Sequence, residues 1–406
     1  MHLKKIIACR HKRKSESVAS DESSHRLKST GPIYGEKLTA KQLEDNLEIA
    51  ARQGSQLYSS SAPLSLPDAP LRRTVSAIKH DLVATGDWKV ATACKKGARP
   101  TFEDAHAVEL LTVRNMKIPF LGVYDGHGGD GVAKLLGQHL HVRFQANLNE
   151  QVKSDDEPTA EMVTFALRKS ILDVDAMVLE RVKGKQMRRH VGSTVSVFTV
   201  VGTWAYHAGV GDASTYCSIG GRQIRMCYHH LLEEGSDEYE RIVKLGGNIN
   251  NSQHGKWRIF DSKGRGGLAV PRAVGDHIYQ NDSGQRIVIP EPFMTRIDLS
   301  SGGKKGAIVC CDGITGDFVS DIQLAAISTH HVPESVARAI AASQEDEDET
   351  LTTAKQIIKC AEGHVAKAKS VSGDNMTVIV TDFDPSGARA LLERSKTPEL
   401  PEFDGQ

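Results

Sequence analysis

The stretch Gly122–Gly129, which reads Gly-Val-Tyr-Asp-Gly-His-Gly-Gly, joins a short apolar run to a helical pattern. The run Ile118–Val123 has the length of a buried strand, and the residues after the stretch repeat apolar side chains at helical spacing. Asp125 is therefore expected where a strand ends, beside glycines that let the backbone approach another group closely. The Asp125 carboxylate, the backbone carbonyl of Gly126 and the His127 side chain then share one small exposed site.

Carboxylates stand in similar places elsewhere in the chain. Asp312 follows an apolar run, Asp374 stands just before another, and Glu103 with Asp104 precedes an alternating one. A strand end is a rigid mount, so carboxylates placed there can be held to the tolerances of metal coordination. Oxygen ligands of this kind favour Mg²⁺ or Mn²⁺ over structural zinc, and two such ions about 3.5–4 Å apart can activate a water and clamp a phosphoryl group. The alternative is that each Asp-Gly pair marks an ordinary turn.

The composition excludes several classes of protein. The chain has 406 residues, and its 51 basic and 51 acidic side chains give no net charge. This balance offers no general attraction to nucleic acid or to an anionic membrane. No apolar run approaches the roughly 18 residues of a membrane span, and the first apolar segment is shorter than the roughly 7 residues of a signal-peptide core.

The cysteines favour a reducing, intracellular setting. There are seven, they follow no metal-ligand spacing, and Cys310-Cys311 lies inside an apolar run, as expected of buried thiols. We therefore expect a cytoplasmic protein. A basic cluster at residues 10–14 adds a nuclear location if it is an import signal rather than a solvated tail.

The chain divides into three parts by composition. Residues 1–80 are rich in Ser, Lys and Arg and are predicted to be a largely disordered extension, with one capped helix at 39–54. Residues 81–384 are predicted to form the ordered domain, and residues 385–406 a short tail. Within the domain, residues 228–285 are irregular in sequence and suit a surface flap beside a site.

The apolar patterns of the domain predict its strands and helices. Strand-forming and helix-forming stretches come in blocks rather than in βαβ alternation, which favours an α+β fold with packed antiparallel sheets. Strands are predicted at 88–94, 105–112, 118–125, 194–201, 204–210, 214–219, 307–311 and 376–381, and helices after residue 129 and at 159–182, 321–329, 334–343 and 351–366.

Seven blocks, in this order, resemble the signature blocks of the metal-dependent serine/threonine protein phosphatases, the type 2C family. The resemblance covers residues 87–382 and makes 81–384 the catalytic domain. It implies a central antiparallel β-sandwich flanked by helices, in four layers (αββα), with the metals at one end. The blocks are Arg99-Pro-Thr-Phe-Glu103-Asp104-Ala105-His106, Tyr124-Asp125-Gly126-His127-Gly128-Gly129, Gly192-Ser193-Thr194, Gly209-Val-Gly211-Asp212, Leu268-Ala-Val-Pro-Arg272-Ala-Val-Gly275-Asp276, Cys311-Asp312-Gly313 and Gly373-Asp374-Asn375-Met376-Thr377.

The resemblance also implies a metal-ligand set for two Mn²⁺ or Mg²⁺ ions. Asp125 matches the carboxylate that bridges both ions, and Gly126 matches a carbonyl ligand of one of them. Asp312 and Asp374 match ligands of the other ion. Glu103 and Asp104 match acidic residues that act largely through metal-bound waters.

Two further residues match catalytic roles. Arg99 matches the phosphate-binding arginine, whose guanidinium fork suits two phosphoryl oxygens. His127 matches the general acid that protonates the leaving Ser or Thr oxygen. The alternatives are that Arg99 merely pairs with Glu103 and that His127 is an exposed turn residue. Arg272 and Asp276 are expected to form a structural ion pair near the site.

Two departures from the family pattern matter. The family usually reads Asp-His-x-Pro before the flap, where this chain has Met226–Glu234 without that motif, so substrate recognition is expected to differ. Many members of the family also have an Asp four residues after the one that matches Asp312. Here that place is Gly316 and the Asp is Asp317, which is expected to point away from Asp212 and leave a third metal site weakly filled.

The sequence thus predicts a signalling enzyme that hydrolyses phosphoserine and phosphothreonine in phosphoproteins with a dimetal-activated water. We expect a monomer that binds no nucleic acid. The alternative from another class is a catalytically weak, phosphatase-like binding scaffold, which the loss of a principal ligand would favour. A dimetal phosphodiesterase or nuclease would need a basic groove, which the charge balance does not indicate.

Overall fold

The computed structural model describes residues 36–37, 82–85, 88–97, 99–153, 157–220, 222–251, 256–315, 354, 357–358 and 374–383, all within the unit Pro32–Gln406. Several predicted features therefore lie outside the described residues. They are the helix at 39–54, most of the extension 1–80, the helices at 321–329 and 334–343, most of the helix at 351–366, and the tail.

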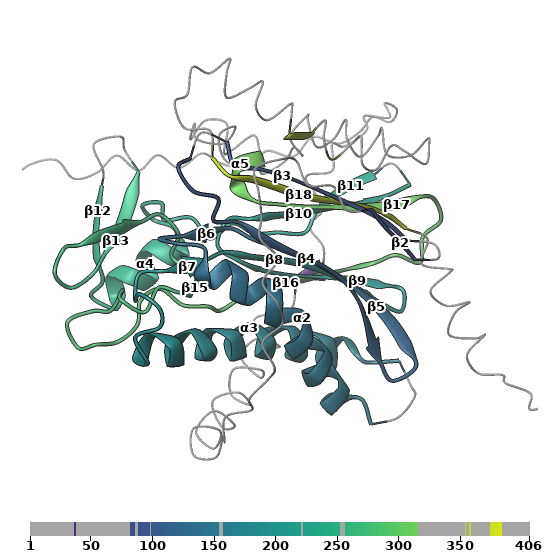
Figure 1. Cartoon of the computed structure of the whole chain (residues 1–406), viewed down its shortest axis with the longest axis horizontal. Coiled ribbons are helices and arrows are strands. Elements are labelled where there is room, and N and C mark those ends of the chain that lie inside the picture. The colour runs from purple at the N-terminus through teal and green to yellow at the C-terminus, as the bar shows by residue number, and fades with distance from the viewer. Residues whose placement is uncertain are drawn as a thin grey trace, which may run out of the picture. The chain divides into compact units, whose positions relative to one another are not determined.

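Two antiparallel sheets form the centre of the described domain (Figure 1). Each has six strands, and every strand pair within them is antiparallel. The first sheet has the order β1 (Glu36–Lys37), β16 (Phe293–Asp298), β9 (Trp204–Val210), β8 (Val195–Val201), β5 (Met116–Tyr124) and β4 (Ala105–Val113). The second has the order β11 (Arg222–Arg225), β10 (Ser214–Ile219), β17 (Lys305–Cys310), β18 (Met376–Phe383), β3 (Trp88–Lys95) and β2 (Leu82–Thr85).

Strand β5 shows how the sheets pack. Leu121 and Val123 belong to the core between the two sheets, whereas Phe120 and Tyr124 belong to the core under the helices. This alternation follows from the two-residue period of a strand. Because β5 is buried on both faces, its sequence is a continuous apolar run rather than an alternating one.

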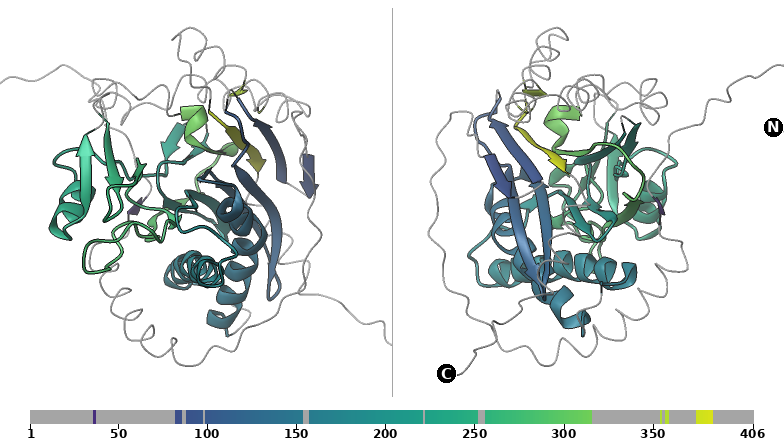
Figure 2. Two further views of the ribbon diagram at one scale, coloured as in Figure 1. Left: turned by 60° about the vertical axis from the view of Figure 1, so that its left-hand side comes forward. Right: turned by 90° about the vertical axis from the view of Figure 1, so that its right-hand side faces the viewer.

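Two long helices cover the outer face of the first sheet (Figures 1 and 2). They are α2 (Gly131–Gln151) and α3 (Ala160–Lys183), and side chains such as Phe144 and Ile171 pack beneath them. The Thr159 hydroxyl caps α3 by accepting a hydrogen bond from the backbone N–H of Met162. No helix among the described residues has both the length and the apolar character needed to cross a membrane.

The segment 228–285 is more ordered than its composition suggested. It contains α4 (Asp237–Lys244) and a small sheet of β12 (Asn248–Asn251), β13 (Trp257–Phe260) and β14 (Gly266–Leu268), with a core of its own. The expectation of an irregular flap was wrong in this respect, because elements this short carry little periodicity. Strand β16 was not predicted either, because Pro290 and Pro292 directly precede it and prolines indicate turns.

A second small sheet links the site to the helices. It has the order β15 (Val274–Gly275), β7 (Gly192–Ser193) and β6 (Gly126–His127). His127 pairs with Gly192, and Gly192 pairs with Gly275 on its other side. Three blocks that are far apart in sequence therefore lie side by side.

Candidate active site

The predicted carboxylates meet at one end of the two central sheets. Asp104 directly precedes β4 and Asp125 directly follows β5, and the pairing of Ala105 with Tyr124 sets the two aspartates side by side. In the other sheet, Asp312 begins the short helix α5 (Asp312–Thr315) just after β17, and Asp374 stands two residues before β18. Each sheet thus contributes two carboxylates.

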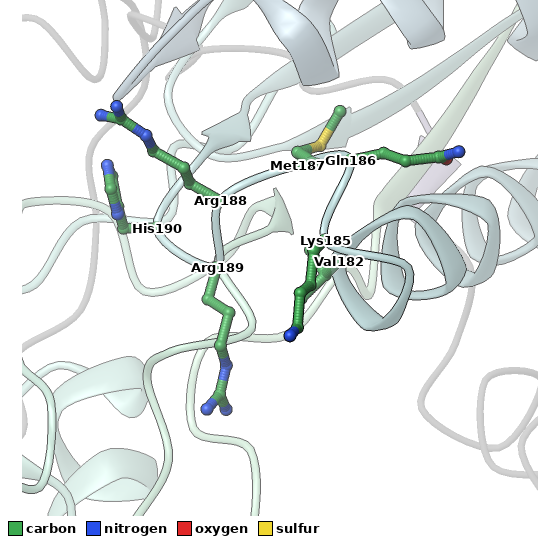
Figure 3. A pocket seen from close by; sticks show the side chains of 7 residues that line it. All are labelled: Val182, Lys185, Gln186, Met187, Arg188, Arg189 and His190. Atoms are coloured by element: carbon green, nitrogen blue, oxygen red, sulfur yellow. The ribbon is translucent and has the colours of Figure 1, made fainter.

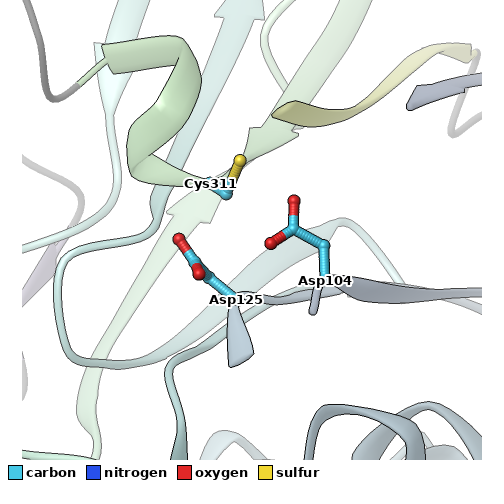
Figure 4. Close-up of side chains that lie close together, drawn as sticks. All are labelled: Asp104, Asp125 and Cys311. Atoms are coloured by element: carbon cyan, nitrogen blue, oxygen red, sulfur yellow. The ribbon is translucent and has the colours of Figure 1, made fainter. Parts of the chain in front are cut away.

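The tightest part of this cluster combines Asp104, Asp125 and Cys311. Each offers one ligand atom, and these three atoms lie within 4.8 Å of one another. Figure 4 shows the three side chains converging from the ends of different strands. The prediction that these strand-end aspartates share one site agrees with this geometry.

The glycines after the aspartates have a packing role. A Cβ on Gly126 would lie 2.4 Å from the backbone oxygen of Glu103, and one on Gly313 would lie 1.9 Å from that of Asn375. Neither glycine has a positive φ. The two Asp-Gly pairs therefore do not mark left-handed turns, and the missing side chains instead let neighbouring backbone segments come close enough for the carboxylates to meet.

Asn375 ties the segment that carries Arg99 to the end of β18. Its Oδ1 accepts a hydrogen bond from the backbone N–H of Glu103 at 2.7 Å. Its Nδ2 donates to the backbone oxygens of Lys96 at 2.8 Å and Thr101 at 2.9 Å. Asn375 was not predicted as a site residue, although its place between a candidate ligand and a strand was a usable signal.

Two threonines hold the aspartates themselves. The Thr377 hydroxyl donates to Oδ2 of Asp104 at 2.7 Å. The backbone of Asp125 exchanges two hydrogen bonds with Thr194, at 3.2 Å to the threonine hydroxyl and 2.9 Å from the threonine N–H. Both threonines belong to the signature blocks, and both act on the orientation of a carboxylate.

The electrostatics of the cluster favour a bound cation. Burial, reinforced by the charges of Asp104 and Asp312, raises the pKa of Asp125 well above its usual range. Burial also raises the pKa of Asp104 to about 7 and that of Asp212 to about 8, and in both cases the charge of Asp312 adds to the shift. The chain has thus collected carboxylates that repel one another.

Two buried carboxylate oxygens also favour a bound cation. Oδ1 of Asp104 and Oδ1 of Asp312 are buried and accept no hydrogen bond from the described residues. A divalent cation would give both oxygens a partner and would offset the mutual repulsion. A set of carboxylate oxygens suits Mg²⁺ or Mn²⁺, so the residues fit the predicted metal.

Cys311 is the member of the cluster that the sequence analysis did not include as a site residue. It is fully buried, as expected for a structural thiol, and burial raises its pKa well above the usual range. Its Sγ donates to the backbone oxygen of Asn375 at 3.4 Å and accepts from the backbone N–H of Thr377 at 3.1 Å. A protonated thiol with two partners is a poor metal ligand, so Cys311 serves the packing of the site.

Arg99 stands at the rim of the cluster. Its Nη2 lies 2.5 Å from Oδ2 of Asp374, and 52% of its side chain is exposed. The alternative pairing with Glu103 was wrong, because that carboxylate instead accepts from the Thr101 hydroxyl and the Gly129 backbone N–H. An exposed guanidinium on a long side chain is free to turn toward an incoming anion.

His127 is paired, and Asp276 is its partner. Nε2 of His127 lies 2.6 Å from Oδ2 of Asp276, which is fully buried. Burial lowers the pKa of His127, but the charge and hydrogen bond of Asp276 outweigh it and hold that pKa above its usual value. A Cβ on Gly192 would lie 2.5 Å from Nε2, so only glycine leaves room for this pair. His127 is therefore not a free turn residue.

The prediction of an ion pair between Arg272 and Asp276 was wrong. Nε of Arg272 donates to Oε1 of Glu238 on α4 at 2.7 Å, while Asp276 is engaged with His127. Residues four apart face each other on a helix, but this segment runs through β15, where they do not. Sequence spacing alone could not show this.

The third metal site is described only in part. Asp212 lies near the cluster, since its charge contributes to the raised pKa values of both Asp125 and His127. Gly316 and Asp317 lie outside the described residues, so the expectation that Asp317 points away stays a prediction.

The chain is similar in sequence to a known protein family. The family model described as "Protein phosphatase 2C" matches residues 88–359. "Probable protein phosphatase 2C 76" of Arabidopsis thaliana is 28% identical over 243 residues, which is 60% of this chain and 52% of that protein. "Protein phosphatase 2C homolog 2" of Aspergillus flavus is 29% identical over 303 residues, which is 70% of this chain and 61% of that protein. The chain thus spans between half and two thirds of the length of these relatives.

Solved structures agree on the fold. A serine-threonine phosphatase 2C from Toxoplasma gondii matches with a TM-score of 0.59 at 18% identity, over 76% of this chain and 100% of that one. A C. elegans sex determining protein matches with a TM-score of 0.54 at 21% identity, over 87% and 75%. At these identities the likeness concerns the fold alone, and it confirms the predicted α+β fold with antiparallel sheets packed against helices.

Proposed function

Because the chain belongs to the protein phosphatase 2C family, we propose that it hydrolyses phosphoserine and phosphothreonine in phosphoproteins. The family depends on Mg²⁺ or Mn²⁺. The observation that carries the proposal is the meeting of four strand-end aspartates, two of which present buried oxygens without a partner among the described residues. Two divalent ions, when bound, supply an activated water and neutralise charge on the phosphoryl group.

In this proposal the ion-holding residues come from both sheets. Asp125 would contribute to both ions, with the carbonyl of Gly126 beside it. Asp312 and Asp374 would hold the second ion. Glu103 and Asp104 complete the oxygen set, and the backbone and hydroxyl contacts described above keep these carboxylates in place.

Arg99 binds the phosphoryl group. A guanidinium presents two parallel N–H donors that match two phosphoryl oxygens. Its present partner is Asp374, so binding of substrate requires the guanidinium to exchange one anionic partner for another. The 52% exposure of Arg99 supports this role, because the side chain can move without disturbing the core.

His127 donates the proton that the leaving serine or threonine oxygen needs. Its Nε2 faces Asp276, so Nδ1 is the nitrogen left for the leaving group. The buried Asp276 fixes the ring and favours its protonated form. His127 thus lies beside Asp125 with its orientation determined by a residue 149 positions away.

We further propose that residues 81–384 act as the catalytic domain of a monomer, in the cytoplasm and also in the nucleus. The match of the family model over residues 88–359 supports the domain bounds. The absence of net charge supports a substrate other than nucleic acid.

The test is hydrolysis of phosphoserine and phosphothreonine peptides by the full chain with Mn²⁺, with Mg²⁺ and with excess chelator. We expect turnover with either metal and none with chelator. Asp282→Asn, an exposed carboxylate away from the cluster, provides the control for loss of charge alone. Full turnover in chelator would refute the metal dependence, and binding of phosphopeptides without turnover would indicate the scaffold.

A further inference from the structure

The segment that follows α3 is strongly basic. Residues 181–190 contain Arg181, Lys183, Lys185, Arg188, Arg189 and His190 and no carboxylate, in a chain whose net charge is zero. We call residues 184–190 the basic loop, and residues 185–190 line a hollow of about 610 Å³ together with Val182 (Figure 3). The hollow is wide open to solvent, which suits contact with an extended peptide rather than enclosure of a small ligand.

The basic loop is held in one conformation. The backbone N–H of Gln186 donates to the oxygen of Arg181 at 2.8 Å. Met187 packs against the core beneath the helices, and a Cβ on Gly131 would lie 3.1 Å from its Cε. Arg189 donates from Nη2 to the backbone oxygen of His277 at 2.9 Å. Arg189 and Met187 therefore serve to fix the loop.

Three cationic or titratable side chains of the loop have no partner in the part of the chain that the structure describes. Lys185, Arg188 and His190 are exposed, and none forms an ion pair or side-chain hydrogen bond with the described residues. Figure 3 shows Arg188 and His190 pointing to one side of the loop and Lys185 to the opposite side. A fixed loop with unpaired charges is suited to bind an anion at little cost in ordering.

The basic loop borders the candidate active site. A Cβ on Gly128 would lie 3.1 Å from ring atom Cδ2 of His190, so that ring lies against the turn that carries His127. The next residue, Val191, accepts a hydrogen bond from the backbone N–H of Asp276 at 3.0 Å. Gly192 then pairs with His127 in the small sheet. The loop therefore adjoins the residue proposed to protonate the leaving group.

We propose that the basic loop binds acidic or phosphorylated side chains of the protein substrate, next to the phosphorylated residue held in the site. The inference rests on the proposed phosphatase function and names the substrate class that this site prefers. The guanidinium of Arg188 and the ammonium of Lys185 suit carboxylate and phosphate oxygens. Because the loop lies on one side of His127, the preference concerns one flank of the peptide only.

The test uses the full chain with Mn²⁺ and phosphoserine peptides that differ only in carrying two Glu or two Gln on the N-terminal or the C-terminal flank. We expect kcat/KM to be about three- to tenfold higher for Glu on one flank, as for two solvent-screened charge pairs. The double variant Lys185→Gln with Arg188→Gln should bring this ratio close to one. Raising the salt concentration should also weaken the preference.

A matched control removes two positive charges elsewhere. Lys117 on β5 and Lys153 after α2 are exposed, and Arg114 links the hairpin of β5 to Val152 at the end of α2. The helix α2 begins at Gly131 beside the site and is about 30 Å long, so both lysines are remote from it. Lys117→Gln with Lys153→Gln should keep the full preference for Glu.

A charge reversal guards against simple loss of folding. Lys185→Glu with Arg188→Glu should prefer peptides with Lys on the same flank, which an unfolded protein could not do. Equal kcat/KM for Glu and Gln peptides in the wild type, or an unchanged preference in the Gln variant, would overturn the inference. So would a Gln variant that loses only binding to phosphatidylserine vesicles. Failure of the wild type on every peptide would instead refute the proposed function.

Discussion

Two regions of the molecule bury carboxylates, and they do so in opposite ways. In the flap, Glu238 is almost fully buried and contacts two arginines, Arg241 at 2.7 Å and Arg272 at 2.5 Å. Burial alone would raise the pKa of Glu238, but the two guanidinium groups outweigh it and hold that pKa below its usual value. At the sheet ends, Asp104 and Asp125 have other carboxylates as neighbours, and their pKa values are raised.

The difference lies in where the counter-charge comes from. Glu238 receives its counter-charge from the chain, so the flap is stable as it folds. Among the strand-end aspartates only Asp374 has a counter-charge from the described residues, the guanidinium of Arg99 at the rim. The cost of burying the other three is offset when a cation binds. Carboxylates that a fold collects without balancing them are therefore a sign of a ligand site.

The largest effect should come from removing a carboxylate of the unbalanced cluster. We expect Asp125→Asn to lower kcat by about 10³-fold, because it removes a charge that holds both ions. In excess chelator the same variant should be at least as stable as the wild type, since it relieves repulsion. Peptide hydrolysis and urea denaturation measure the two effects, and a large loss of stability in chelator would show that Asp125 is instead balanced like Glu238.

The pair of His127 and Asp276 is intermediate between Glu238 and the strand-end aspartates. Asp276 lies in the site, but the imidazole of His127 balances its charge. His127→Ala should lower kcat by about 10²-fold for phosphoserine peptides, since a serine alkoxide needs a proton to leave. The loss should be much smaller for an aryl phosphate, whose phenolate leaves without one. Parallel assays on both substrates check this, and equal losses would show that His127 has another role.

Glu238, whose charge is balanced by two arginines, should contribute to the stability of the fold rather than to catalysis. Glu238→Gln leaves two partly buried arginines without their charge partner, so we expect the free energy of unfolding to fall by about 2–3 kcal/mol. Glu240→Gln on the exposed face of the same helix is the matched control and should change little. Urea denaturation of the two variants gives the comparison, and equal stability would mean that the Glu238 network contributes nothing net.

The smallest effect concerns pH in the absence of metal. The pKa of Asp104 is about 7 in the folded chain, against about 3.9 when unfolded. Between these values the folded state holds the extra proton, so this residue lowers the free energy of unfolding as the pH rises. Glu238 has a lowered pKa, so its contribution is present above its unfolded pKa and is lost only as the pH falls through the folded one.

The test compares unfolding free energies at pH 5, 6 and 7 in excess chelator. Asp104→Asn should show a weaker fall between pH 5 and pH 7 than the wild type. Glu238→Gln should keep the wild-type slope over that range even though it is less stable. If the unfolding free energy changed with pH equally in all three proteins, the pKa of Asp104 would not be raised in the folded state.

Much of the site was predictable because its signals are local. A carboxylate at the end of an apolar run, followed by glycine, indicates a rigid mount within a few residues of sequence. Asp125 and Asp312 were found in this way, Asp104 and Asp374 were found because they stand just before a strand-like run, and the order of the blocks indicated the family. The bounds of the eight predicted strands also followed to within two residues, because the two-residue and continuous apolar patterns are properties of single strands.

The partners of these residues were decided by the tertiary structure. Asp276 pairs with His127 across 149 positions, and Arg272 pairs with Glu238 across 34, whereas the sequence suggested that Arg272 and Asp276 pair with each other. Sheet order sets such contacts, and a hydrogen bond between distant segments leaves no trace in the spacing of either one.

The sequence by itself therefore determined which chemical groups the site contains and the kind of element that carries each. Tertiary structure alone decided that Gly126 and Gly313 are needed for close backbone approach, that Cys311 lies among the carboxylates, and that the basic loop adjoins His127. The physical reason is that side-chain chemistry and secondary structure are local properties of the chain. Burial, charge balance and proximity arise only when the sheets pack.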